Sequence, residues 1–486
     1  MKTVLLVALG DKHWTNFALN MSEKLSRQGI PVIIAMESRL GEYQLFLKRI
    51  KYNAKKVYYL TDYIKADAHN KKECGEDCYV IPEKVVMADF NRNYYLRAHS
   101  FLFNSNWHDI KDKLASFYSK IFRENEISVV IHDTVSTSFS YVSYLIARHK
   151  NIPYYGLVGA KVPGRYEIRK SIYEEHLKVK NIYDSIKNTR DEITEDDIKW
   201  ATDYLSRIDE QVPSYMKTGI LNRISFRNIL NLKYFKLFVG TILFSIMERE
   251  QVRNLILREQ PVKANLRSFL RNFNRNIKKR TAIKLMENVT TKWCDNHDFY
   301  VYPLHYQPEA STLIGSPHFN NQIDFIINAA FSLPPNHYLL VKEHISNYAF
   351  PNNDFYRIIK ALPNVKLVSP YMNIKDLIRK SKGLITLTST AGFEAVLLNK
   401  PVYIFGGVFY EFHPLCKKIY SWTQLEKELQ IEPVIKDYDN ISFLLAYRKY
   451  TRPHKLDFNV SDFLVSDDLL NVVKEEIIEK ELNKIY

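Results

Sequence analysis

The stretch GLITLTSTAGFEAVLLNKPVYIFG, residues 383–406, holds two short apolar runs on either side of a helical pattern. The runs at 383–388 and 401–406 have the length of buried strands, and 391–399 between them predicts a helix. Strands joined through a helix normally run parallel, because the crossover returns the chain to the same edge of the sheet. This stretch therefore predicts a parallel α/β sheet.

The same alternation of strand and helix extends through the second half of the chain. Further strands are predicted at 299–305, 337–344 and 365–369. Further helices are predicted at 321–332, 354–361 and 373–381.

A second α/β unit is predicted in the first half of the chain. Its elements are a strand at 3–9, a helix at 16–27, strands at 31–35 and 128–132, a helix at 139–149, a strand at 154–158 and a turn at 159–166. The loop at 10–14 carries no G-x-G-x-x-G, so the dinucleotide fingerprint is absent.

The length of 486 residues calls for more than one domain. We predict an α/β fold of two doubly wound, Rossmann-like domains joined by a helical basic connector. The predicted boundaries are an N-terminal acceptor-side domain at 1–205, the connector at 206–295, a C-terminal donor-side domain at 296–425 and a helical tail at 426–486.

The net charge of +15 is concentrated in one segment. Residues 217–292 hold 17 Lys and Arg against four Glu and no Asp. Within it, 229–247 is too short to span a bilayer but has the flanking charges of a helix that lies on anionic lipid. An inter-domain brace with solvated charges explains the segment equally well. Nucleic-acid binding is the weakest interpretation, because no recognised motif accompanies the charge.

Four cysteines are too few for a disulfide framework and favour a reducing cytoplasm. The Cys74–Cys78 spacing is a weak metal or redox signal. The apolar run at the N-terminus is too short for a signal peptide and is better explained as the first strand.

Three polar strand exits in the second half are the strongest candidates for a binding site. Ligands of doubly wound sheets bind outside the carboxyl ends of the strands. The candidate donor-side residues fall into three groups. The first exit has His305, Gln307 and Glu309, the second has Lys342, Glu343 and His344, and the third has Ser389, Thr390, Gly392 and Glu394. Ser389 or Thr390 can cap a helix whose free amides favour a phosphate. Taken singly, the first exit is also explained as a polar turn, the second by a structural histidine, and the third as an ordinary capped helix.

The first half offers fewer polar exits. Asp11 and His13 follow the first strand, Asp133 follows the strand at 128–132, and Lys161 and Arg165 lie in the turn at 159–166. Asp133 is equally well explained as a cap of the next helix.

The runs PLHYQPEAST, VKEH and LTSTAGFEAVLLNKPVYIFGGVFY resemble the capsule polysaccharide biosynthesis family, which includes bacterial β-Kdo transferases. The resemblance covers roughly 298–415 and implies a GT-B fold and a nucleotide-sugar donor such as CMP-Kdo. It places the phosphate-contacting histidine of the family at His344, with Ile345 where the family has proline. It also places Glu309 where the Kdo transferases usually have Asp.

The resemblance implies a glycosyl transfer in which the nucleotide sugar is a co-substrate and no other cofactor is needed. Glu309 is the first candidate for the catalytic carboxylate and Asp133 the second. No Asp-x-Asp motif stands at a strand exit, so we expect a metal-independent transfer. The expected acceptor is a surface or lipid-linked glycan, and the expected location is the cytoplasm or the inner face of its membrane.

Two other functions remain open on the sequence. One is an enzyme that acts on a different nucleotide sugar, such as an epimerase or a polyol-phosphate transferase. The other is a non-catalytic factor in glycan assembly or export.

Overall fold

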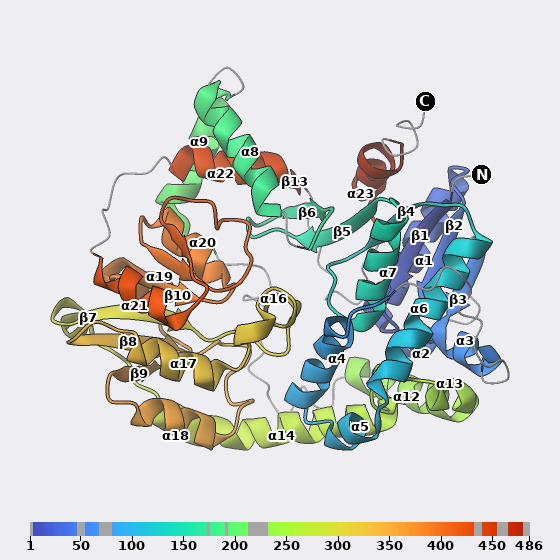
Figure 1. Cartoon of the computed structure of the whole chain (residues 1–486), viewed down its shortest axis with the longest axis horizontal. Helices are drawn as coiled ribbons and strands as arrows, with labels where there is room; N and C mark the ends of the chain where they lie inside the picture. The colour runs from blue at the N-terminus through green and yellow to red at the C-terminus, as the bar shows by residue number, and fades with distance from the viewer. Residues whose placement is uncertain are drawn as a thin grey trace.

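The computed structural model describes residues 3–45, 54–67, 80–172, 175–189, 193–211, 232–431, 440–453 and 465–479. Two sheets stand side by side, and one long helix, α14 (Pro261–Leu285), runs along the edge of both (Figure 1). The predicted Cys74–Cys78 pair lies outside the described residues, as do parts of the basic connector and the tail.

The N-terminal sheet has seven strands in the order β13-β6-β5-β4-β1-β2-β3. These are β1 (Thr3–Ala8), β2 (Val32–Met36), β3 (Lys56–Tyr59), β4 (Ile127–His132), β5 (Tyr154–Gly159), β6 (Arg165–Arg169) and β13 (Arg452–Pro453). The five strands from β5 to β3 in this order are parallel, and β6 and β13 close one edge in antiparallel pairs. All six residues of β1 are buried, as helices on both faces of a parallel sheet require.

The helices of this first domain fill the connections between its strands. They are α1 (Lys12–Arg27), α2 (Leu40–Gln44), α3 (Leu60–Asp67), α4 (Lys84–Tyr95), α5 (His99–Asn104), α6 (Trp107–Glu124) and α7 (Ser138–His149). Helix α1 begins four residues earlier than predicted, because the Asp11 carboxylate caps its first turn.

The C-terminal sheet has six parallel strands in the order β12-β11-β10-β7-β8-β9. These are β7 (Asp298–Pro303), β8 (His337–Lys342), β9 (Val365–Val368), β10 (Gly383–Thr386), β11 (Val402–Ile404) and β12 (Cys416–Lys418). Its helices are α16 (Ala310–Leu313), η3 (Pro317–Phe319), α17 (Gln322–Phe331), α18 (Asn353–Ala361), α19 (Ile374–Lys380), α20 (Thr390–Leu397) and α21 (Trp422–Gln430). The predicted fold class, two doubly wound α/β domains, is confirmed.

The described part of the connector is mostly helical. Besides α14 it contains α12 (Leu232–Met247), α13 (Arg249–Arg253) and α15 (Thr291–Asp295). Among the described residues, no helix combines the length and the apolar character that crossing a bilayer needs.

The chain crosses between the two domains more often than predicted. Helices α8 (Glu175–Asn188), α9 (Glu195–Ser206) and α22 (Asn440–Tyr450) share one core with the C-terminal sheet. Helix α23 (Asp467–Val472) and the turns at Val473–Glu479 pack on the N-terminal sheet. Helices α8 and α9, which start before the predicted boundary at 205, thus pack with the C-terminal sheet, and α23 of the predicted tail packs with the N-terminal sheet.

Candidate functional site

The three polar strand exits of the second half lie at one edge of the C-terminal sheet. They follow β7, β8 and β10, and β7 lies between the other two. All three strands run parallel, so their carboxyl ends meet at the same edge.

His305 joins the first exit to the third. Its side chain is buried, and its Nε2 atom accepts a hydrogen bond of 3.2 Å from the backbone amide of Thr388. Its own amide donates to the Gln322 side chain at 2.7 Å. Burial lowers the pKa of His305 to about 3, so the ring stays neutral and can accept. His305 is therefore a positioning residue.

Gln307 and Glu309 share a loop but have different roles. Gln307 donates to the carbonyl of Asn320 at 2.6 Å and accepts from Gln322 at 2.9 Å, so both ends of its amide hold the loop. The side-chain carboxylate of the exposed Glu309 accepts, among the described residues, only from the hydroxyl of Ser311, at 2.7 Å. Glu309 is thus the polar group of this loop that remains available to a ligand.

The second exit contains two buried ionisable groups and a half-buried histidine. The ammonium of Lys342 donates to the carbonyls of Glu343 and Pro370, and burial lowers its pKa to about 8. Glu343 is fully buried and accepts from the amide of His344 at 2.6 Å; burial raises its pKa to about 7. Glu343 therefore fixes the exit turn and does not face a ligand.

His344 lies beside the first exit. Its ring centroid is 6.0 Å from that of Tyr306, and its Nδ1 atom accepts from the amide of Ser346 at 3.2 Å. Burial lowers the pKa of His344 to about 4. The neutral ring can therefore offer its remaining N–H to an anionic ligand.

The third exit is the start of α20. Ser389 is the N-cap and accepts from the amide of Ala391, and Thr390 is the first helical residue. A side chain at Gly392 would collide with the hydroxyl of Tyr410, which donates to the carbonyl of Ser389. The absence of a side chain at Gly392, one of the predicted donor-side residues, thus makes room for the Tyr410 side chain.

Glu394 lies one turn further along α20, next to a lysine that the sequence analysis did not select. The Lys375 ammonium is 3.8 Å from the Glu394 carboxylate and also donates to the carbonyl of Gln211 at 2.7 Å. Burial raises the pKa of Glu394 to about 7, although Lys375 and Lys342 oppose that shift. Near neutral pH this carboxyl group can both accept and donate hydrogen bonds. It can therefore bond to sugar hydroxyls, which are themselves both donors and acceptors.

The N-terminal domain contacts the loop that carries Glu309. The Tyr95 hydroxyl on α4 donates to the carbonyl of Asn320 at 2.7 Å, and Ile314 packs into the core of the N-terminal domain. Figure 1 shows α16 directed from the C-terminal domain toward α4. The first strand exit is thus at the junction of the two domains.

On the N-terminal side, Asp133 is the most perturbed of the predicted residues. Its Oδ1 atom is 3.6 Å from Nε2 of His132, and neither atom has a hydrogen-bond partner among the described residues. Burial and the nearby Asp11 raise the pKa of Asp133 well above its ordinary value. Asp11 accepts from the amides of His13 and Trp14, which explains it as a helix cap.

Lys161 and Arg165 lie apart from these groups. Arg165 belongs to β6 and not to a turn, and its guanidinium donates to the carbonyls of Arg448 and Thr451 at 2.8 and 2.7 Å. The backbone amide of Lys161 donates to the Tyr447 hydroxyl at 2.9 Å. Arg165 therefore closes the end of α22, and the structure gives it no access to an acceptor.

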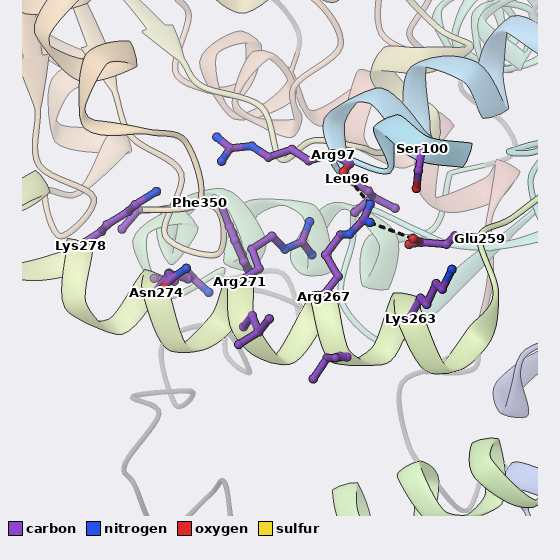
Figure 2. A pocket seen from close by; sticks show the side chains of 14 residues that line it. Leu96, Arg97, Ser100, Glu259, Lys263, Arg267, Arg271, Asn274, Lys278 and Phe350 are labelled. Carbon is purple, nitrogen blue, oxygen red and sulfur yellow. Dashed lines mark hydrogen bonds and ion pairs between the residues drawn. The ribbon is translucent and has the colours of Figure 1, made fainter. Parts of the chain in front are cut away.

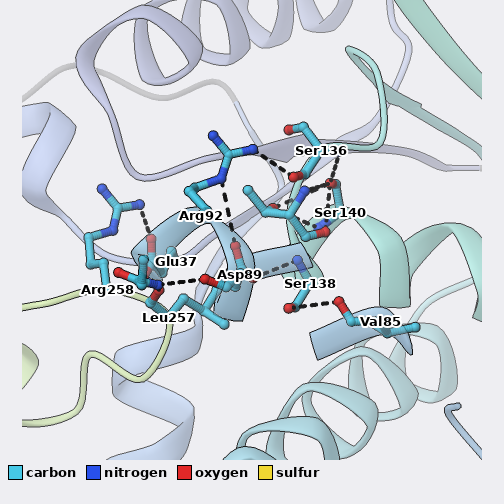
Figure 3. Close-up of polar contacts among 11 residues, drawn as sticks. Glu37, Val85, Asp89, Arg92, Ser136, Ser138, Ser140, Leu257 and Arg258 are labelled. Atoms are coloured by element: carbon cyan, nitrogen blue, oxygen red, sulfur yellow. Dashed lines mark hydrogen bonds and ion pairs between the residues drawn. The ribbon is translucent and has the colours of Figure 1, made fainter. Parts of the chain in front are cut away.

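Figure 3 shows a buried polar cluster that the sequence analysis missed. Glu37, at the exit of β2, forms an ion pair with Arg258 of the connector. Asp89 on α4 accepts from the amide of Ser138 at 2.7 Å and lies 4.0 Å from Arg92. The cluster ties the connector and α4 to the sheet edge that carries Asp133. Glu37 could have been found, because it follows a strand as the other candidates do.

Residues 248–431 match the family described as capsule polysaccharide biosynthesis protein. Comparison with curated proteins gives no match. Similar solved structures include KpsC, beta Kdo 2,7 transferase, from Thermosulfurimonas dismutans, with 14% identity, a TM-score of 0.34 and coverage of 68% of this chain and 79% of that chain. The beta Kdo 2,4 transferase of KpsC from the same organism has 14% identity, a TM-score of 0.34 and coverage of 72% and 94%.

A third similar structure is the S. aureus MnaA–UDP co-structure, with 12% identity, a TM-score of 0.26 and coverage of 98% and 97%. The family match spans all three polar strand exits and the whole of α14. The resemblance to the capsule polysaccharide biosynthesis family is thereby confirmed over residues 248–431.

Proposed function

We propose that this protein is a glycosyltransferase that moves a sugar from a nucleotide-sugar donor to a surface polysaccharide or a lipid-linked glycan. The observation that carries the proposal is the edge of the C-terminal sheet, where the half-buried His344 and Glu394, the buried Lys342 and the exposed Glu309 all lie at or beyond the carboxyl ends of neighbouring parallel strands. The family resemblance favours Kdo or a related acidic sugar as the transferred group.

The donor phosphate is assigned to His344 and the start of α20. The neutral imidazole of His344 is a hydrogen-bond donor, and the amides of the first helical turn favour an anion. Glu394 is assigned to hydroxyl groups of the donor, since its pKa of about 7 lets it accept or donate. These assignments use groups from the second and third strand exits, and His305 of the first exit holds the third in position through Thr388.

The transfer breaks the bond between the anomeric carbon and the phosphate oxygen and forms a bond from that carbon to the acceptor oxygen. The nucleotide leaves with the bonding electrons, and the acceptor hydroxyl gives its proton to a carboxylate. Glu309 is the proposed nucleophile or base on the donor side. Asp133, which follows β4, is the proposed base on the acceptor side once its buried carboxyl group is deprotonated.

The connector is the proposed membrane-facing surface. On α12 the exposed apolar side chains are Phe235, Phe238, Leu243, Ile246 and Met247. On α14 they are Leu266, Phe269, Leu270, Phe273 and Ile277, which recur at helical spacing on one face. An apolar face with basic flanks suits an anionic bilayer and would bring a lipid-linked acceptor to the domain junction. The proposed location is therefore the inner face of the cytoplasmic membrane.

The test is the release of nucleotide from a panel of CMP- and UDP-sugars. We expect Glu309→Gln to slow release about 100-fold or more while nucleotide binding is kept. Glu426→Gln, on an exposed turn of α21, is the matched control and should behave as wild type. Asp133→Asn should reduce transfer to an acceptor more than donor hydrolysis. Nucleotide binding without turnover of any donor would instead favour a non-catalytic assembly factor.

A further inference from the structure

A cavity of about 420 Å³ lies between α14 and the segment that joins α4 to α5 (Figure 2). Ala349 and Phe350 of the C-terminal domain close one side, so both domains contribute to it. The lining contains one carboxylate, Glu259, and six cationic side chains: Arg97, Lys263, Arg267, Arg271, Arg275 and Lys278. The cavity is therefore strongly basic.

Two of the arginines that line the cavity are bonded to other parts of the protein. Arg267 pairs with Glu259 at 2.8 Å and donates to the backbone carbonyl of Arg97 at 2.6 Å. Arg275 donates to the carbonyls of Tyr348 and Ser346 at 2.7 and 3.0 Å. One arginine thus ties α14 to the N-terminal domain, and the other ties it to the C-terminal domain.

Arg271, one turn from each of these arginines, has no such partner. Its Nε atom is buried and lacks a hydrogen bond to any described residue. Its guanidinium carbon lies 4.9 Å from the centre of the Phe350 ring, and Figure 2 shows the side chain directed into the cavity. A buried N–H without an acceptor is costly in a protein alone and is satisfied when an oxyanion binds.

Arg97 supplies a second guanidinium, which has no ion pair with any residue that the structure describes. It is exposed, its backbone is left-handed with a φ of 58°, and its side chain extends along the same cavity in Figure 2. A non-glycine residue is uncommon in that conformation. The ammonium groups of Lys263 and Lys278 stand at the two ends of the lining and, within the described ranges, have no ion pair.

We propose that this cavity binds a phosphoryl group, as a phosphomonoester or a diphosphate, at a site separate from the donor edge. Arg271 and Arg97 are its main ligands. Arginine recognises phosphate through paired N–H groups, and several unpaired cations match a group that carries about two negative charges. The inference goes beyond the proposed transfer and does not depend on it.

The position of the cavity allows two sources of the phosphoryl group. The charged row of α14 faces the cavity, while Phe269, Phe273 and Ile277, which do not line it, are exposed on the same helix. A lipid headgroup could therefore reach the cavity from a membrane. A soluble phosphorylated ligand could equally enter from solvent.

The first arm of the test is calorimetric binding of inorganic pyrophosphate to the full chain. Arg271→Gln and Arg97→Gln should each weaken binding about tenfold or more. Arg280→Gln, which removes the same charge from an exposed position of α14, should leave binding unchanged. Arg97 is exposed, so its variant keeps the test valid if Arg271→Gln fails to fold. Loss of binding in Lys342→Gln alone would place pyrophosphate at the donor edge and overturn the proposal.

The second arm compares phosphatidylcholine vesicles doped with phosphatidic acid or with phosphatidylserine at equal surface potential. If the source is a lipid headgroup, Arg271→Gln and Arg97→Gln lower binding to phosphatidic acid vesicles only. If the source is soluble, both vesicle types bind the variants as they bind wild type, while pyrophosphate binding is lost. Unchanged binding of both variants in both arms would overturn the proposal. Neither arm needs a nucleotide-sugar donor or catalytic turnover. Absence of pyrophosphate or vesicle binding is therefore distinguishable from absence of the proposed transferase activity.

Discussion

The Nε2 atom of His305 and the backbone amide of Thr388 are joined by a hydrogen bond of 3.2 Å, although the residues are 83 positions apart in the chain. The bond links the loop that carries Glu309 to the loop that starts α20. Any change in the protonation of His305 therefore acts on two strand exits at once.

We expect His305 to make the protein sensitive to acid. Its pKa is about 3 in the folded state and 6.5 in the unfolded state, so below pH 6.5 only the unfolded chain takes up this proton. Stability should fall as the pH decreases, by up to about 1.4 kcal/mol per pH unit. His305→Gln keeps an acceptor for Thr388 and should flatten the melting temperature between pH 6.5 and 4. The exposed His318→Gln is the control, and parallel curves for the two variants would refute this.

Glu343 should have the opposite effect on stability between pH 4.5 and 7. Burial raises its pKa from 4.5 to about 7, so between these values the unfolded chain loses a proton that the folded protein keeps. Stability should then decrease as the pH rises from 4.5 to 7, by up to about 1.4 kcal/mol per pH unit. Glu343→Gln retains the acceptor for the His344 amide and should remove that slope in thermal unfolding. A slope equal to that of wild type would show that Glu343 is not buried as a neutral acid.

Gly392→Ala should destabilise the protein by about 1–3 kcal/mol, because the new methyl group meets the Tyr410 ring and hydroxyl. Tyr410→Phe removes the hydroxyl and its hydrogen bond to Ser389, at a cost of about 1 kcal/mol. The double variant should be more stable than the sum of the two changes predicts. Chemical denaturation measures all three, and strict additivity would mean that the two side chains do not collide.

The apolar face of α14 should bind anionic vesicles. Phe269→Ser with Phe273→Ser should weaken co-sedimentation with phosphatidylglycerol vesicles by about tenfold or more, since each buried phenyl ring contributes about 1.5–3 kcal/mol. Phe331→Ser, on an 82% exposed side chain of the C-terminal domain, is the matched control. Binding should also fall with added salt. Equal binding of the double variant and the control would contradict a membrane role for this face.

The central strands of both sheets could be predicted from the sequence, whereas β3, β6, β12 and β13 were not predicted. Helix α20 begins at Thr390 and β11 at Val402, each within a residue of the prediction from 383–406. Such elements depend on the period of neighbouring side chains, which the sequence displays directly.

The contacts between distant segments could not be predicted in this way. Arg165 has the chemistry of an acceptor ligand, but its partners are carbonyls at 448 and 451, nearly 300 residues away. Gln307 is likewise satisfied by Asn320 and Gln322, which carry no motif. The role of a polar side chain depends on whether another part of the chain already uses its hydrogen bonds, and a local pattern does not contain that information.

Helix α14 fixes the distance and the relative rotation between its attachments to the two domains. Arg267 bonds the N-terminal domain and Arg275 the C-terminal domain, and the helix is continuous between them. An added residue in this span would lengthen it by about 1.5 Å and turn one attachment about 100° away from the other. Chimeras that exchange either domain must therefore keep the helical phase of the connector. The number of residues between the two arginines is as much a part of the domain junction as the side chains that line it.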